Sequence, residues 1–176
     1  RFLARVHGPV SGNVLLRREQ YRRADDPGKS LLIARSMVIG KIVNSRTALL
    51  RAARENKSGG SEGFSFAASR LAGILRLIES VVDLDTLRGV EGEAARIYFS
   101  VFDAFICAQK DDFFFRERSR RPPMDSMNAL LSFLYTLLVH DTSSALESVG
   151  LDPAVGYLHA VRPGRPSLAL DIMEEL

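Results

Sequence analysis

A chain of 176 residues, 46% of them hydrophobic, fits one domain that can bury roughly 70% of its unfolded surface. It has no apolar run of about 18 residues and no basic-then-apolar leader, so we expect a cytoplasmic protein with no membrane partner. The single cysteine, Cys107, excludes an internal disulfide and a cysteine-rich zinc cluster, and it lies in an apolar run, where a free thiol usually acts as a small hydrophobe.

Charge is unevenly distributed along the chain. Residues 1–54 carry twelve Lys or Arg against three Asp or Glu, a balance of +9, whereas residues 55–176 carry twelve against eighteen, a balance of −6. Arginine outnumbers lysine twenty to four, and its planar fork suits bidentate contact with phosphate. The basic first third favours a polyanionic partner, although the solvated face of a protein from a GC-rich genome would show the same pattern.

The first half of the chain is expected to be helical after a short lead. Residues 1–7 include a short strand or linker that fits the end of an upstream domain. Helices are predicted over residues 14–23, from the N-cap Asp26 to about residue 53, over residues 66–82, and from the N-cap Asp85 to about residue 108. The Gly/Ser-rich residues 55–63 should form a mobile connection.

The second half continues with helices between charged and proline-containing loops. A charged loop over residues 110–123 precedes a helix that begins near Asp125. A short helix ends at Gly150, another begins at Pro153, and the last begins near Pro166. Because no useful strand pattern follows residue 10, the expected fold class is all-α, with one helical domain over residues 8–176 that is cut from a longer protein.

Separated acidic and histidine positions suggest a site for a divalent cation. His159 follows a proline-containing turn and precedes a short helix with Asp171 and Glu174. Glu91 shares a helical face with two alanines and a tyrosine, and the alanines would let another element approach its carboxylate. Taken singly, each has an ordinary alternative: an ion-paired glutamate, a hydrogen-bonded histidine and a solvated acidic face.

Basic residues are the candidates for contact with phosphate. Several lie in the charged loop ahead of Pro122 and Pro123, which keep it extended, although an exposed basic loop without a partner is an equal alternative. No P-loop, dinucleotide-binding or serine-hydrolase motif is present. The candidate DNA contacts are Arg17, Arg22, Arg46, Arg118, Arg120, Arg121, Arg162 and Arg165.

Five segments of the chain form a combination found in one known family: LLRREQYRRADD, KIVNSRTALLRAARE, LRGVEGEAARIYF, RRPPMDSMNALLSFLYTLL and VGLDPAVGYLHAVRPGRPSLALDIMEEL. Taken together, they resemble the CRISPR-associated Cas1 integrase family. The likeness runs from about Gly8 to the end of the chain. The motifs at residues 91–99 and 150–175 are specific in combination, and they are similar to the variant of subtype I-C systems.

The resemblance implies a two-domain protein with an N-terminal β domain that mediates dimerisation and a helical catalytic domain, most of which is this chain. It implies Glu91, His159 and Glu174 as metal ligands, with Asp171 as a second acidic residue and the competing third ligand. The implied cofactor is Mn²⁺ or Mg²⁺, and two carboxylates with one imidazole suit Mn²⁺ better.

The implied activity is a metal-dependent endonuclease and integrase that inserts new spacers into a CRISPR array by transesterification, as part of antiviral defence. The implied partners are double-stranded DNA, a second copy of the protein and the small subunit Cas2. Two rival hypotheses come from other classes: a non-catalytic helical nucleic-acid-binding module, which would bind no divalent metal, and a helical scaffold, which would show no salt-dependent binding to DNA.

Overall fold

The computed structural model describes residues 13–55 and 61–173, and within these ranges it contains helices and no strand. The described residues form six α-helices in turn: α1 (Val14–Ala24), α2 (Pro27–Glu55), α3 (Ser61–Leu77), α4 (Leu84–Phe99), α5 (Ser126–Ser148) and α6 (Ser167–Met173). Two short 3-10 turns, η1 (Ile78–Ser80) and η2 (Phe102–Phe105), follow α3 and α4. The prediction of an all-α fold is confirmed; residues 1–7, predicted as a strand or linker, lie outside the described ranges.

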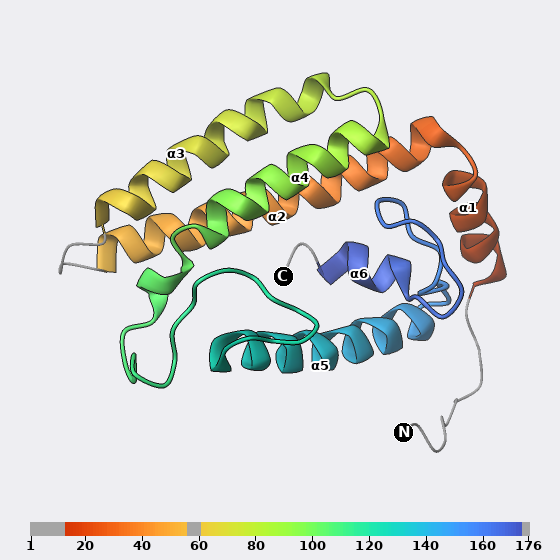
Figure 1. Ribbon diagram of the computed structural model, residues 1–176. Helices are drawn as coiled ribbons and strands as arrows, with labels where there is room; N and C mark the ends of the chain where they lie inside the picture. Colours follow the sequence, from red (N-terminus) through yellow and green to blue (C-terminus); the bar gives the residue numbers. More distant parts are fainter. Residues whose placement is uncertain (1–12, 56–60, 174–176) are drawn as a thin grey trace, which may run out of the picture.

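The main core lies between α2, α3 and α4, which run side by side (Figure 1). Each helix turns a stripe of apolar residues three, four or seven apart toward the others, as an amphipathic helix must. Burying such side chains contributes about 1.5–3 kcal/mol each. The fully buried members include Val38, Ile42 and Leu49 of α2, Phe64 and Leu71 of α3, and Leu87 of α4.

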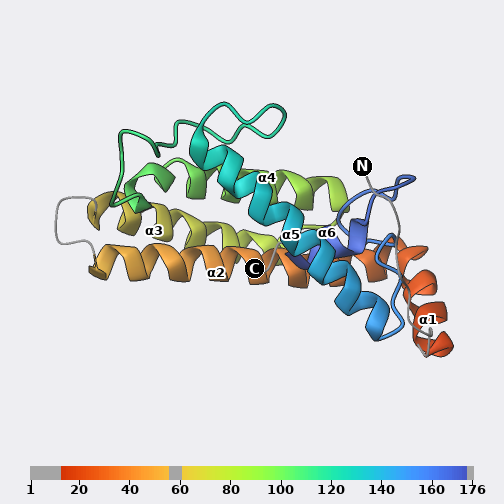
Figure 2. The ribbon, with the colours of Figure 1, turned by 90° about the horizontal axis from the view of Figure 1, so that it is seen from below.

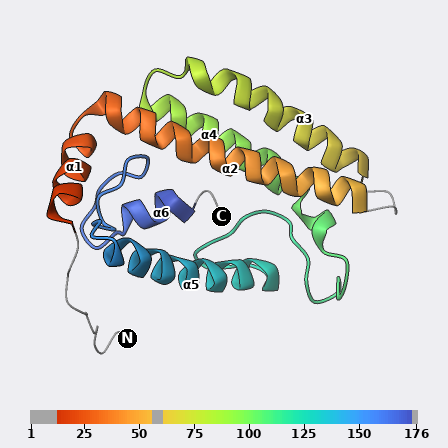
Figure 3. The ribbon, with the colours of Figure 1, turned by 180° about the vertical axis from the view of Figure 1, so that it is seen from behind.

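A second layer holds α5 and α6. The short α6 lies between α2 and α5 in Figures 1 and 3, and α5 crosses the direction of α2 in Figure 2. A small apolar cluster joins these elements, with Met37 from α2, Leu146 from α5, and Leu168 and Ala169 from α6. The first residues of α6 are therefore anchored between two long helices, and this fixes the position of the C-terminal acidic motif.

Aspartate caps begin three of the helices. The Asp26 carboxylate accepts hydrogen bonds from the backbone of Gly28 and Lys29, at 3.0 and 3.1 Å, as predicted. The prediction of Asp85 as the cap of α4 was wrong. Asp83 has the extended backbone of a cap and accepts from the Thr86 N–H at 2.8 Å, so Asp85 lies in the first turn of the helix.

The end of α4 also differs from the prediction. The helix stops at Phe99 rather than near residue 108, because the aromatic residues that follow turn back onto one another. Phe115 stacks against Phe99 with ring centroids 5.5 Å apart, and Phe102 packs on Phe115 at 4.8 Å. Cys107, which its apolar neighbours suggested as a small hydrophobe, follows this turn and is exposed.

Other helix boundaries also differ from the prediction. Residues 61–63, predicted within a mobile connection, form the first turn of α3, whereas Gly59 and Gly60 lie outside the described residues. The helix predicted to end at Gly150 is the last turn of the long α5, and no helix begins at Pro153. Residues 151–166 instead form turns and bends, with glycines of positive φ just before the segment, at 150, and within it, at 164.

Helix α5 has an outward apolar stripe. Leu130, Phe133, Leu134 and Leu137 recur at helical spacing and are 41–60% exposed. In the part of the chain that is described, α5 is the one helix long and apolar enough to cross a membrane by length and composition, which is weak support for a span. Its inner face packs on α6 and carries the buried polar residues Asn128 and Thr142.

Candidate metal centre and the basic pocket beside it

Asp171 organises the loop that carries His159. The side chain is fully buried, and its Oδ2 accepts hydrogen bonds from the N–H groups of Tyr157 and Leu158, at 2.5 and 3.0 Å. Its Oδ1 accepts from the His159 N–H at 2.9 Å and lies 2.7 Å from His159 Nδ1. A proton on Nδ1 shared with this carboxylate makes Nε2 the ring nitrogen suited to a cation, as in carboxylate–histidine–metal arrangements.

A close backbone approach makes this arrangement possible. A Cβ atom at Gly156 would lie 2.7 Å from Asp171 Oδ2 and 2.8 Å from both the carbonyl carbon and the Cβ of Ser167. Only glycine leaves room for the carboxylate at this point. From the other side, the buried Gln20 side chain donates to the carbonyl oxygens of Asp152 and Val155, at 2.8 and 3.1 Å.

Glu91 lies on α4, near the same loop. One turn earlier on this helix, Arg88 Nε donates to the Leu158 carbonyl at 2.8 Å, and Leu158 packs into the main core. This bond ties the residue next to His159 to the turn of α4 that precedes Glu91. The two predicted ligands therefore come from elements that are joined directly.

The Glu91 carboxylate accepts a hydrogen bond from Lys41 Nζ, and the two side chains are 23% and 21% exposed. The ordinary interpretation of Glu91, an ion-paired glutamate, is thus correct in this structure. Of its predicted neighbours, Ala94 is buried in the core, whereas Ala95 and Tyr98 line a pocket.

Two of the predicted ligands are of types that divalent cations bind. They are the Glu91 carboxylate and an imidazole held through Nδ1 by a buried carboxylate. Among residues 13–55 and 61–173, no three His, Cys, Asp or Glu side chains gather closely enough to hold a metal ion. The implied third ligand, Glu174, lies outside those ranges. Asp171 already uses both oxygens to hold the 157–159 loop, an arrangement that favours Glu174 over Asp171 as the third ligand.

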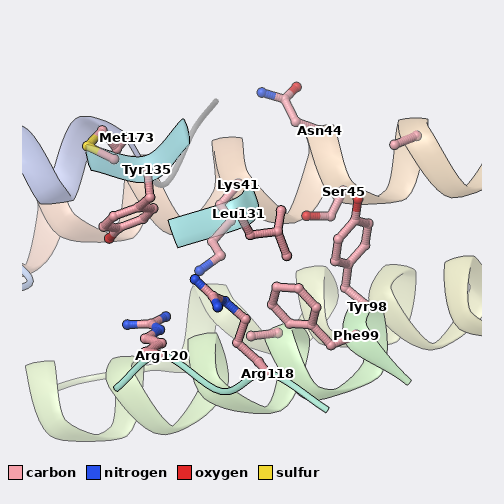
Figure 4. A pocket seen from close by; sticks show the side chains of 12 residues that line it. Lys41, Asn44, Ser45, Tyr98, Phe99, Arg118, Arg120, Leu131, Tyr135 and Met173 are labelled. Atoms are coloured by element: carbon pink, nitrogen blue, oxygen red, sulfur yellow. The ribbon is translucent and has the colours of Figure 1, made fainter. Parts of the chain in front are cut away.

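A basic pocket of about 280 Å³ opens beside Lys41, between α2, α4, α5 and the loop before α5 (Figure 4). Arg118 and Arg120 reach it from the loop, and Met173, the last described residue of α6, lines it as well. We call this cavity the basic pocket. Its lining is Lys41, Asn44, Ser45, Ala48, Ala95, Tyr98, Phe99, Arg118, Arg120, Leu131, Tyr135 and Met173.

Asn128 positions Arg118. The fully buried Asn128 side chain accepts from Arg118 Nη1 at 2.8 Å and from the Ser119 N–H at 3.0 Å, and donates to the Glu117 carbonyl at 2.8 Å. Partial burial lowers the pKa of the Arg118 guanidinium, and the neighbouring charge of Arg120 lowers it further. Arg120 lies over the ring of Tyr135, 5.9 Å from its centroid.

The other predicted DNA contacts are dispersed. Arg17 Nε donates to the Gly150 carbonyl at 3.0 Å, so this side chain supports a loop. Arg46 is half-buried, and its Nε has no hydrogen-bond partner among the described residues. Arg22, Arg121 and Arg162 are exposed, and Arg165 lines a second pocket that also contains His140 and Glu147. Only Arg118 and Arg120 of the predicted set line the basic pocket.

Sequence reasoning missed three residues that shape the site: Lys41, Asn128 and Gly156. Lys41 contacts Glu91 across 50 residues of sequence, and this pairing left no local pattern. Gly156 was detectable as a glycine inside the motif that leads to His159, and Asn128 as a polar residue one turn into an apolar helix.

Comparisons with known proteins show the family to which the chain belongs. A family model described as CRISPR associated protein Cas1 matches residues 1–176. A CRISPR-associated endonuclease Cas1 of Rhodospirillum rubrum is 58% identical over 181 residues, which cover 100% of this chain and 52% of the relative. The chain spans about half the length of the curated relatives it matches.

Solved structures share the fold. A chain of a partial Cas6-RT-Cas1–Cas2 complex superposes with a TM-score of 0.80 at 29% identity, over 99% of this chain and 51% of that one. A casposase bound to its integration product gives a TM-score of 0.71 at 27% identity, over 95% of this chain and 47% of that one. The likeness to subtype I-C systems stays a prediction. The family match over the full chain, together with the helical fold and the His159 loop, shows that this chain belongs to the CRISPR-associated Cas1 family.

Proposed function

We propose that this chain is the helical catalytic part of a metal-dependent DNA endonuclease and integrase that inserts new spacers into a CRISPR array. The observation that carries the proposal is the set of four hydrogen bonds by which buried Asp171 holds the 157–159 loop and orients His159. Because the carboxylate holds Nδ1, Nε2 is the ring nitrogen that can bind a cation. The names of the relatives, which are Cas1 endonucleases, support the same activity.

Glu91, His159 and Glu174 would hold the divalent cation, with Asp171 behind His159. A bound divalent cation stabilises negative charge on the oxygens of a phosphate under attack. Carboxylate and imidazole ligands suit Mn²⁺, and Mg²⁺ is accommodated less well because it prefers oxygen ligands and water. The chain's own residues would orient the cation and neutralise the DNA backbone.

The proposed reaction is a transesterification. The 3′-hydroxyl of a captured fragment attacks a phosphodiester of the repeat, a new P–O bond forms, and the bond to the repeat's own 3′-oxygen breaks. The attacking hydroxyl loses its proton and the leaving oxygen gains one. Because the hydroxyl attacks the phosphorus directly, no covalent enzyme intermediate is needed. Arg118 and Arg120, which lie in the basic pocket, would bind phosphates next to the reacting one.

The partners proposed for the full-length protein are double-stranded DNA, a second copy of the protein and the small subunit Cas2. Support comes from the solved relatives, one of which is a complex that contains Cas2 and another a casposase bound to an integration product. Dimerisation through an N-terminal β domain remains a prediction from the family resemblance.

The test compares variants of the implied ligands in the full-length protein. Glu91→Gln and His159→Ala should each lower metal-dependent strand transfer by roughly a hundredfold or more, because each removes a cation ligand. Chelation of the metal should abolish activity in the unaltered protein. Glu93→Gln is the matched control, since Glu93 lies on the same helix and pairs with Arg70 and Arg96.

The third ligand is decided by a second pair of variants. Glu174→Gln should abolish metal binding while the protein stays folded, whereas Asp171→Asn should mainly lower thermal stability and loosen the loop of His159. Full strand transfer by Glu91→Gln would contradict the proposal. If chelation also left DNA binding unchanged, the non-catalytic binding module would be the better description.

A further inference from the structure

The pair formed by Lys41 and Glu91 differs from the other ion pairs of the chain. Between described residues, it is the least exposed pair that involves a lysine or an arginine, with side chains 21% and 23% exposed. The Lys29–Asp26 pair on the same helix is 54% and 42% exposed. Ion pairs in water contribute little, whereas a partly buried pair holds its two groups more firmly.

The Lys41 ammonium binds the Glu91 carboxylate, which is also a proposed ligand of the cation. A divalent ion binds a carboxylate oxygen at about 2.0–2.6 Å, and an ammonium group at the same oxygen would lie within a few ångströms of the ion. Two like charges at that separation repel strongly where water is partly excluded. Binding of the cation to Glu91 therefore requires the Lys41 ammonium to move.

The basic pocket offers a place for the displaced ammonium. Lys41 already lines this pocket together with Arg118 and Arg120, and Figure 4 shows the Lys41 amine directed into it from α2. A lysine stem has four rotatable bonds, and its ammonium binds phosphate as a point charge. Three cationic side chains around one open cavity would match the backbone of a nucleic acid.

We propose that Lys41 is an exchange residue. In the metal-free protein its ammonium holds the Glu91 carboxylate; when the cation takes Glu91, Lys41 turns into the basic pocket and binds a phosphate of the DNA strand. Metal and DNA would then favour each other, because a phosphate in the pocket draws the ammonium away from Glu91. This inference rests on the metal site of the proposed function.

The experiment measures Mn²⁺ binding to the full-length protein without DNA, by the electron paramagnetic resonance signal of free Mn²⁺. Lys41→Met keeps an apolar stem without the charge, and it should bind Mn²⁺ roughly three- to tenfold more tightly than the unaltered protein because the competing ammonium is gone. With saturating Mn²⁺, the same variant should bind DNA several-fold more weakly, with a salt slope about one unit shallower.

Matched variants separate the outcomes. Lys29→Met, on the same helix, should change neither affinity, and Lys41→Arg should stay close to the unaltered protein in both. Lys41→Gln provides a second neutral side chain if Lys41→Met does not fold, as judged by circular dichroism. Unchanged or weaker Mn²⁺ binding in the folded neutral variants would overturn the inference.

Failure of the metal site itself gives a different result. If the unaltered protein binds Mn²⁺ no better than Glu91→Gln, the proposed metal centre is wrong and Lys41 has nothing to exchange with. If Glu91→Gln loses Mn²⁺ binding while Lys41→Met matches the unaltered protein, only the exchange role of Lys41 is wrong.

Discussion

The carboxylate of Asp171 explains why position 156 is a glycine. The backbone of residue 156 runs so close to Asp171 and Ser167 that any side chain would enter the space of the carboxylate. That carboxylate in turn holds three consecutive N–H groups and the ring of His159. The absence of a Cβ atom at residue 156 thus leaves room for the Asp171 carboxylate, and that carboxylate holds His159, a proposed metal ligand, in place.

Gly156→Ala should therefore destabilise the protein by about 1–3 kcal/mol, the usual cost of overpacking a filled site. It should also weaken Mn²⁺ binding, because His159 would be displaced with its loop. Thermal unfolding and a Mn²⁺ titration measure the two effects. Gly89→Ala is the control, since a Cβ there meets nothing within 4 Å and alanine favours a helix. Equal stability of the two variants would contradict this account.

At the residue scale, a local motif carried part of the information. The sequence placed His159 before a short helix with Asp171 and Glu174, and the structure shows Asp171, twelve residues after His159, against the His159 ring. The sequence did not predict that Asp171 would accept hydrogen bonds from the loop of His159, because this depends on which backbone N–H groups point at the carboxylate. Lys41 was missed for a related reason, since its partner lies on another helix.

At the scale of elements, α5 and the loop before it act as one unit. Asp125 caps the helix at the start that the sequence predicted, and it accepts from the Asn128 N–H at 2.6 Å. One turn into the helix, the Asn128 side chain then satisfies three groups of the loop. The start of α5 therefore places Arg118 in the basic pocket.

Asn128→Ala should cost about 2–3 kcal/mol, because it leaves buried donors and acceptors of residues 117–119 without their partner. DNA binding should weaken as well, since Arg118 loses the acceptor that orients it. Chemical denaturation and a DNA titration at fixed salt would measure both. Thr136→Ala is a suitable control, because this exposed hydroxyl bonds only to the carbonyl of its own helix. An Asn128→Ala protein as stable as that control would refute the role of the network.

Helix starts were easier to predict than helix ends. Asp26 and Asp125 mark the starts of α2 and α5, whereas at α4 Asp83 and Asp85 compete within three residues and the earlier one caps the helix. The end of α4 and the turns of residues 151–166 depend on tertiary packing: aromatic stacking on Phe115 at one, and hydrogen bonds to Asp171, Gln20 and Arg88 at the other. A single sequence does not record those contacts.

At the scale of the whole molecule, the basic residues that make the charge of the sequence uneven have different roles in the structure. Some arginines of the basic first third are structural, as Arg17 shows by holding the Gly150 carbonyl. The cations of the basic pocket come instead from both halves of the chain: Lys41 from the first third, Arg118 and Arg120 from the loop before α5. The charge balance indicated a polyanionic partner, and the fold determines which of the cationic side chains lie around the same pocket.

Binding of the full-length protein to DNA should consequently depend steeply on salt. If the three pocket cations each neutralise one phosphate, the logarithm of the affinity should fall with a slope of about −2.7 against the logarithm of salt, or about fortyfold between roughly 50 and 200 mM. Additional contacts would make the slope steeper. Fluorescence anisotropy with labelled duplex DNA over that range measures it directly.

The source of that slope can be assigned with single variants. Arg120→Ala removes a pocket cation and should make the slope shallower by about one unit. Arg22→Ala removes an exposed charge on α1 that already faces Glu19 at 3.8 Å, so the slope should change little. If Arg22→Ala lowered the slope as much as Arg120→Ala, the DNA would follow the basic first third rather than the pocket. A slope near zero for the unaltered protein would favour a scaffold that binds proteins, because phosphate contacts cannot form without releasing counterions.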